Sequence, residues 1–230
     1  AITPLVAEAD SSKNTKAVTS SLKHGLILCA CISLALLLGM LFSVPLMEKM
    51  NQPKDVVVLA MPYLKIIAIS IVPLVIFEGL KRFSDGLSKT KYPMYAAVFS
   101  NALNIILNYL LIFGMFGFPK LGIIGAGIGT LISRILMVLF IILIFFNKDK
   151  IKTYFLNIDF LKTEKKVFKK IFNLGFPSAL QMLFEVGIFT AAIWLSGTLG
   201  KIYQAANQIA FNLSAITFMV GVGLGVAAMI

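Results

Sequence analysis

A carboxylate lies near the middle of a long apolar stretch, residues 176–198, which reads FPSALQMLFEVGIFTAAIWLSGT. The stretch is long enough to cross a bilayer and carries no Lys or Arg beside Glu185. A charge at that depth costs about 2.5–3.5 kcal/mol on insertion scales, and acidic residues kept there commonly carry protons or cations. Glu185 is therefore the first candidate for a functional site. A purely structural Glu185, protonated and paired with an amide, is the alternative.

Amide side chains accompany this carboxylate. Gln181 stands one helical turn before Glu185, on the same face of the expected helix. Oxygen ligands of this kind suit a hard cation such as Na⁺, whereas burial would favour the protonated form and make Glu185 a proton carrier. The residues alone do not decide whether Glu185 binds Na⁺ or H⁺. The next apolar stretch adds amides at helical spacing, which are Gln204, Asn207, Gln208 and Asn212.

A second stripe of amides lies within residues 93–115. Asn101, Asn104 and Asn108 are spaced i, i+3 and i+7, so they share one face of a helix. Such amides can join helices, at roughly 0.6 kcal/mol per hydrogen bond, or they can line a hydrated cavity that holds polar groups of a substrate. Two stripes together with a carboxylate favour the cavity.

The composition requires a membrane. Of the 230 residues, 59% are hydrophobic and 13% are charged, and the mean hydropathy is +0.92, whereas soluble domains carry about 25% charged residues. The apolar residues form long runs without alternation, which predicts an all-α polytopic transmembrane bundle and not a β-barrel. No nucleophile elbow, phosphate-binding loop or metal-ligand cluster is present, so we expect neither an enzyme nor a bound cofactor.

Six spans are predicted, interrupted by polar segments. Residues 1–9 read as the tail of a further span, and residues 10–21 read as a polar loop. Pro62 and Pro73 are expected to break the second span. Both ends of the chain look cut beside membrane segments, which suggests part of a longer protein. His24 stands alone and is assigned no role. The predicted spans are residues 25–44, 56–80, 93–115, 125–146, 176–198 and 203–230.

The basic residues gather on one side of these spans. Connections on one side carry fifteen Lys and Arg, eight of them within residues 147–173, and those on the other side carry four. This bias predicts that the basic loops are cytoplasmic, in a plasma membrane or cell inner membrane. The charge then serves topology and contacts with membrane lipids, and nucleic acid is not an expected partner. An amphipathic interfacial helix is predicted from Phe160, Leu161, Val167, Phe168, Ile171 and Phe172.

A glycine pattern opens the fourth span. Residues 123–130 read IIGAGIGT, which superficially matches a dinucleotide fingerprint but lacks its spacing and its βαβ context. Gly125 and Gly129 instead predict a small-xxx-small surface for close helix packing.

Several motifs resemble one transporter family. They are DGLSKTKYP at residues 85–93, FGMFGFPKLGIIGAG at residues 113–127, and the pair FEV at 184–186 and NQIAFN at 207–212. Together they resemble multidrug and toxic compound extrusion (MATE) transporters, in particular the NorM-type branch, over essentially the whole chain.

The resemblance implies twelve helices in two six-helix lobes. Residues 1–146 would then form the end of the N-terminal lobe, from the tail of helix two to helix six. Residues 147–173 would form a basic cytoplasmic linker, and residues 174–230 would begin the C-terminal lobe with helices seven and eight. The implied function is a monomeric antiporter that exports cationic amphiphilic drugs by alternating access, in exchange for Na⁺ or H⁺.

The family also assigns candidate sites. Its C-lobe cation carboxylate falls on Glu185, which would bind the coupling cation, Na⁺ included. An N-lobe site in other branches uses an Asn followed four residues later by an Asp, and those positions here are Asn104 and Asn108. The missing carboxylate disfavours an N-lobe proton relay.

The alternative to drug export is a lipid or polysaccharide flippase of the related superfamily. Its cavity would be basic, whereas Glu185 favours cationic cargo.

Overall fold

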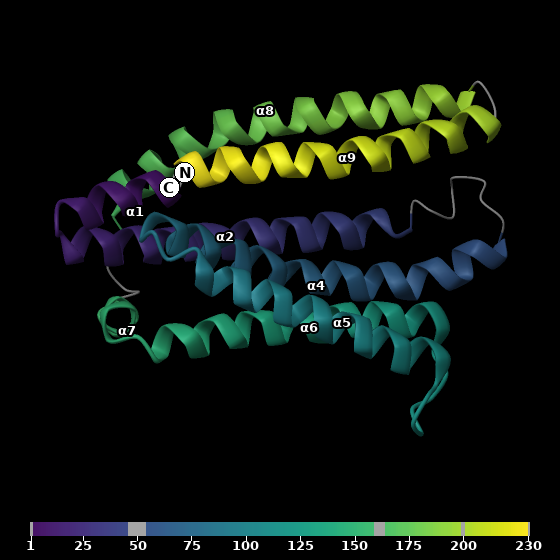
Figure 1. The fold of residues 1–230 in the computed structure, drawn as a ribbon, viewed down its shortest axis with the longest axis horizontal. Coiled ribbons are helices and arrows are strands. Elements are labelled where there is room, and N and C mark those ends of the chain that lie inside the picture. Colours follow the sequence, from purple (N-terminus) through teal and green to yellow (C-terminus); the bar gives the residue numbers. More distant parts are fainter. Residues whose placement is uncertain (1, 46–53, 159–163, 199–200, 230) are drawn as a thin grey trace. The chain divides into compact units, whose positions relative to one another are not determined.

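The structure, a computed structural model, describes residues 2–45, 54–158, 164–198 and 201–229, and every regular element in these ranges is a helix (Figure 1). The predicted all-α class is confirmed. Two compact units, residues 2–168 and 169–230, are described separately below. The helices are α1 (Ile2–Ser11), α2 (Thr15–Ser43), α4 (Lys54–Gly86), α5 (Lys91–Phe113), α6 (Gly122–Phe146), α7 (Asp149–Leu156), α8 (Lys165–Thr198) and α9 (Lys201–Met229).

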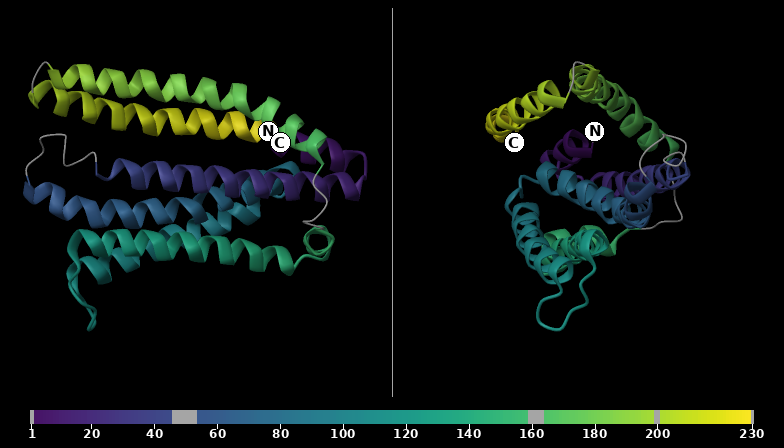
Figure 2. Two further views of the ribbon diagram at one scale, coloured as in Figure 1. Left: turned by 180° about the vertical axis from the view of Figure 1, so that it is seen from behind. Right: turned by 90° about the vertical axis from the view of Figure 1, so that its right-hand side faces the viewer.

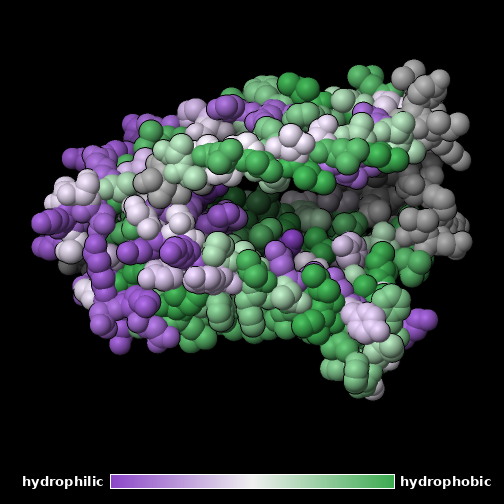
Figure 3. Space-filling view, in the orientation of Figure 1, coloured by the Kyte–Doolittle hydropathy of each residue, from purple (hydrophilic) through white to green (hydrophobic). Residues whose placement is uncertain are grey.

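Six of these helices are long and apolar enough to cross a membrane, which confirms a multi-pass membrane protein. Large apolar side chains lie exposed along them, for example Ile105 and Phe42, as expected for surfaces that face lipid. In Figure 3 the hydrophilic residues gather at the end of the unit where α1 and α2 meet and where α7 lies. The candidate spans are Thr15–Ser43, Val57–Gly86, Lys91–Phe113, Gly122–Phe146, Lys165–Ile193 and Ala205–Gly225.

Two sequence predictions about helix ends were wrong. The polar loop expected at residues 10–21 is mostly helical, because α2 begins at Thr15 and Asn14 caps it by accepting a hydrogen bond from the backbone N–H of Ala17 at 3.1 Å. Val18 is buried within this polar segment and anchors it to the core. Nor do Pro62 and Pro73 interrupt α4, which runs continuously through both. A proline removes one backbone hydrogen bond, which packing against neighbouring helices can offset.

The basic connection divides differently from the prediction. Its first part forms the short helix α7, and Val167 and Ile171 belong to the first turns of α8. Phe160 and Leu161 lie outside the described residues. Among the described residues, the separate interfacial helix is therefore replaced by an extension of α8, which runs from Lys165 through Pro177 without a break.

An aromatic cluster closes the polar end of the first unit. Phe83 is fully buried and its ring lies 6.3 Å from Phe145, 6.3 Å from Tyr154 and 6.2 Å from Phe155, each at a steep interplanar angle. Edge-to-face pairs of this kind contribute about 0.5–1.5 kcal/mol beyond their burial. The cluster joins α4, α6 and α7.

An ion pair holds α7 to the end of α1. Lys150 Nζ donates to Asp10 Oδ1 at 2.9 Å, and Tyr154 donates its hydroxyl proton to the same oxygen at 3.3 Å. The hydrogen bond to Asp10 raises the pKa of Lys150, and burial raises the pKa of Tyr154. Both groups therefore keep their protons at neutral pH.

Helices α5 and α6 approach each other at the predicted glycines. A Cβ placed on Gly125 would lie 2.5 Å from the carbonyl oxygen of Leu111, and one on Gly129 would lie 2.6 Å from Asn108 Oδ1. The small-xxx-small surface is confirmed, because any side chain at these positions would push the two helices apart.

In the second unit, α8 and α9 run side by side in opposite directions (Figure 2). The rings of Phe189 and Phe211 meet at 5.4 Å between centroids. Asn207 Nδ2 donates to Ser196 Oγ at 3.2 Å, which adds a polar contact between the two helices.

The glycine contact gives a stability prediction. Gly125→Ala should lower the stability of the full-length protein by about 1–3 kcal/mol, because the new methyl group meets backbone that cannot rotate away. Gly39→Ala is the matched control, since nothing lies within 4 Å of a Cβ there. Thermal unfolding in detergent measures both. Equal midpoints for the two variants would contradict the close α5–α6 packing.

Candidate functional site

The amide stripe of α5 faces α6, and Asn104 is its centre. Asn104 Nδ2 donates to Ser133 Oγ at 3.1 Å and lies 3.4 Å from Thr130 Oγ1. Its Oδ1 accepts a hydrogen bond from Asn108 Nδ2 at 3.1 Å. The hydroxyls donate onward to backbone carbonyls of α6, Ser133 to Gly129 at 2.7 Å and Thr130 to Ala126 at 2.9 Å. The network is thus a contact between helices.

The ends of the stripe behave differently. Ser100 extends the network by donating to the carbonyl of Ser133 at 2.9 Å. Asn101 is exposed. Asn108 Oδ1 is buried and has no hydrogen-bond partner within the described part of the chain. Asn104 therefore joins the two helices, and Asn108 bonds to it from the same helix. Their role in lining a substrate cavity stays a prediction.

Arg134, a cationic side chain in the middle of α6, had no role assigned from the sequence. Arg134 is partly buried, and its Nη1 donates to Ser70 Oγ of α4 at 2.6 Å. Ser70 itself is fully buried. An Arg inside an apolar run was the available signal, because charged residues in spans are rarely without a partner. The first unit therefore holds a basic group at mid-span, beside its network of amides.

The residues predicted around Glu185 lie in the second unit. Glu185 and Gln181 are both exposed on α8. On α9, Gln208 Nε2 donates to Asn212 Oδ1 at 3.5 Å, and Asn207 bonds to Ser196 as described. Within the described residues, none of these hydrogen bonds reaches Glu185. The side chain of Gln204 lies outside the described residues.

A broad, open apolar surface lies along the same helix, and Val186, the residue after Glu185, is part of it. The carboxylate thus stands beside a surface suited to the apolar part of a ligand. The other lining residues are Ala179, Met182, Leu183, Gly187, Thr190 and Ala191.

A preformed multi-carboxylate metal site does not occur among the described residues, where no three His, Cys, Asp or Glu side chains are grouped.

The fold and these polar groups define a class, a polytopic helical membrane protein with charged and amide groups inside its spans. Residues 1–110 match the family model described as MatE. A protein named "Probable multidrug resistance protein NorM" from Bacillus anthracis is 32% identical over 228 residues, covering 99% of this chain and 50% of its own length. "Multidrug resistance protein NorM" from Vibrio parahaemolyticus is 28% identical over 230 residues, covering 100% of this chain and 50% of its own length.

Solved structures agree in fold. One described as the outward-facing conformation of a multidrug resistance MATE family transporter of the MOP superfamily has a TM-score of 0.77 at 22% identity, covering 98% of this chain and 49% of that chain. The inward-facing conformation of such a transporter has a TM-score of 0.67 at 24% identity, covering 79% and 40%. The family model and the curated relatives confirm the resemblance to the MATE family, and the solved structures agree with it in fold. It spans about half the length of the curated relatives it matches.

The Asn104 network gives a second stability prediction. Asn104→Ala should cost about 1–2 kcal/mol, because it removes the bonds between α5 and α6 but leaves Thr130 and Ser133 bonded to backbone carbonyls. Asn101→Ala, on the exposed face of the same helix, should change stability by less than about 0.5 kcal/mol. Denaturation in detergent compares the two, and an unaffected Asn104 variant would contradict the structural role.

Proposed function

We propose that the protein is a cation-coupled exporter of drugs that works by alternating access, and not an enzyme. The observation that carries the proposal is Glu185, a carboxylate in the middle of an apolar span. The names of the relatives support it, since several are called multidrug resistance proteins. The coupling ion is Na⁺ or H⁺, and the working unit is a monomer.

The coupling follows from the energy of a charge in a membrane. Binding H⁺ or Na⁺ neutralises Glu185 and removes the cost of the bare carboxylate, about 2.5–3.5 kcal/mol. A difference of that size shifts an equilibrium between two conformations by about 100-fold. Cation binding from outside therefore favours the state that releases the drug outward, and loss of the cation inside resets the protein.

The proposed cargo is a cationic amphiphile. Its positive charge is attracted to Glu185 when the coupling cation has left, and its apolar body packs on the surface formed by Met182, Leu183 and Val186. Gln181 adds an amide one turn away. Cargo and coupling cation then compete for one carboxylate, which is the simplest way to force exchange. The amides that remain candidates for cavity lining are Asn101, Asn104, Asn108, Gln204, Asn207, Gln208 and Asn212.

A second candidate function is transport of a lipid or polysaccharide by a flippase mechanism. Arg134 favours it, because this mid-span guanidinium could bind an anionic headgroup. Its hydrogen bond to the buried Ser70 instead uses the guanidinium as a link between α4 and α6. Drug export therefore remains the first proposal.

Glu185→Gln tests the proposal, because it keeps the shape of the side chain but removes the titratable charge. We expect drug resistance of cells that express the full-length variant to fall to the level of cells without the protein. Glu78→Gln is the matched control, since Glu78 forms a half-exposed ion pair with Lys81 at 3.4 Å and should keep resistance. Undiminished resistance in the Glu185 variant, at equal membrane levels, would refute the coupling role.

The charge bias predicts an orientation in the plasma membrane or cell inner membrane with α7 in the cytoplasm. Cysteines introduced at Lys120 and Lys152, both exposed, report on opposite sides. A membrane-impermeant maleimide should label the cysteine at position 120 in intact cells and the one at position 152 after permeabilisation. The reverse pattern would overturn the orientation.

A further inference from the structure

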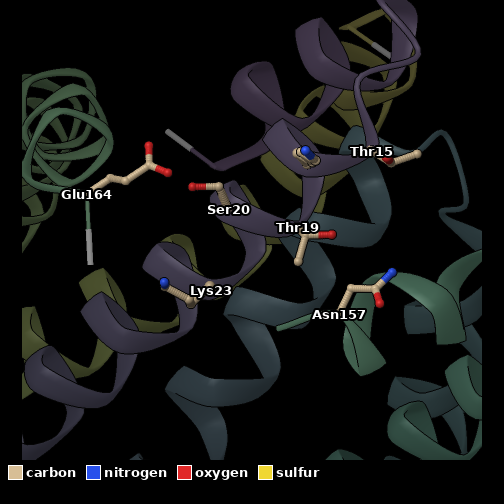
Figure 4. A pocket seen from close by; sticks show the side chains of 7 residues that line it. Thr15, Thr19, Ser20, Lys23, Asn157 and Glu164 are labelled. Atoms are coloured by element: carbon tan, nitrogen blue, oxygen red, sulfur yellow. The ribbon is translucent and has the colours of Figure 1, made fainter. Parts of the chain in front are cut away.

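A cavity of about 400 Å³, lined by polar and charged residues, lies within the first unit, between the start of α2, the end of α7 and the residue before α8 (Figure 4). None of the residues that line it belongs to the proposed transport site. Its walls carry both signs of charge, which distinguishes it from a simple basic surface. The cavity therefore suits a ligand that carries a negative and a positive group.

One wall suits an anion. Lys16 and Lys23 both line the cavity, and Lys23 is buried with 6% of its surface exposed. Thr15, Thr19 and Ser20, which each carry a hydroxyl, line the cavity from the same helix, and the start of α2 adds the partial positive charge of a helix N-terminus. Two ammonium groups with several hydroxyl donors provide the hydrogen bonds that a phosphate group accepts.

The opposite wall carries one carboxylate. In Figure 4 the side chain of Glu164 points across the cavity toward Ser20. A lone phosphate would be repelled by this group, whereas a phosphate with an attached ammonium group would be attracted by it. Asn157 lines the cavity as well and can bond to either group.

A buried histidine fixes Glu164 in place. The backbone N–H of Glu164 donates to His24 Nε2 at 2.9 Å, so the ring proton is on Nδ1, which lies 2.7 Å from the carbonyl oxygen of Ser20 and donates to it. His24 is fully buried. This residue had no assigned role in the sequence, and the structure makes it the link that positions the acidic wall.

The length of α2 predicts that the cavity lies at the depth of lipid headgroups. The 29 residues of α2 extend about 43 Å, whereas the hydrocarbon core is about 30 Å thick. Because the apolar run begins near Gly25, the first turns of α2, which line the cavity, project into the interface.

We propose that this cavity binds the headgroup of a phosphatidylethanolamine lipid. The phosphate contacts Lys16, Lys23 and the hydroxyls of α2, and the primary ammonium group contacts Glu164. Its three N–H donors distinguish it from the quaternary ammonium of choline, which cannot donate. The site is independent of transport at Glu185, so the two proposals can fail separately.

Native mass spectrometry of the purified full-length protein tests the site by titration with dioleoyl phosphatidylethanolamine. Dioleoyl phosphatidylcholine and dioleoyl phosphatidic acid are compared in parallel. We expect Lys16→Gln to weaken phosphatidylethanolamine binding about tenfold, the effect of one charge-assisted hydrogen bond. Lys152→Gln, an exposed lysine outside the cavity, is the matched control and should leave binding unchanged.

Glu164→Gln tests the acidic wall. We expect it to abolish the preference for phosphatidylethanolamine over phosphatidic acid while the protein stays folded, because Glu164 is exposed. Equal binding of the three lipids by the unaltered protein would overturn the proposal, as would equal effects of Lys16→Gln and Lys152→Gln. Displacement of the bound lipid by free phosphoethanolamine at equal concentration would overturn the lipid assignment and assign the same chemistry to a soluble ligand.

Discussion

The first unit depends on the close approach of α5 and α6. The approach requires glycine at positions 125 and 129, since a Cβ at either would collide with Leu111 or Asn108 of the facing helix. Once the helices are this close, Asn104 reaches the hydroxyls of α6. In hydrocarbon an amide without a partner is costly, so the glycines and the amides stabilise the same interface.

The polar side chains within the spans differ in whether a neighbouring helix bonds to them. In the first unit, Asn104 and Arg134 are each bonded to a neighbouring helix. In the second unit, Glu185 and Gln181 are exposed on a helix whose surroundings are apolar. A satisfied polar group stabilises structure, whereas an exposed carboxylate in such a surface is available to a cation or a cationic ligand. This contrast is why the transport proposal centres on α8.

The sequence predicted the all-α class, the six spans and the glycine surface, because long apolar runs and small-residue spacing act locally. It failed where the outcome depends on packing. Asn14 and the buried Val18 extend helix into a polar segment, and α8 begins at Lys165, within the basic connection, and runs through Pro177.

The hydrogen-bond partners of side chains were harder to predict from the sequence than the helix ends. The stripe of α5 was recognised, but its division into a bonded Asn104 and an exposed Asn101 depends on the position of α6. His24 looked isolated because its partner, the backbone of Glu164, is 140 residues away. No local pattern reveals such a contact.

The central claim is that a cation gradient drives drug movement through Glu185. The most direct measurement is drug transport by the full-length protein in liposomes, with an imposed Na⁺ or H⁺ gradient and no other energy source. The account predicts that one of the two gradients drives accumulation of a cationic drug and that Glu185→Gln abolishes it. Drug accumulation that is independent of both gradients, or that persists in the Glu185→Gln variant, would contradict this claim.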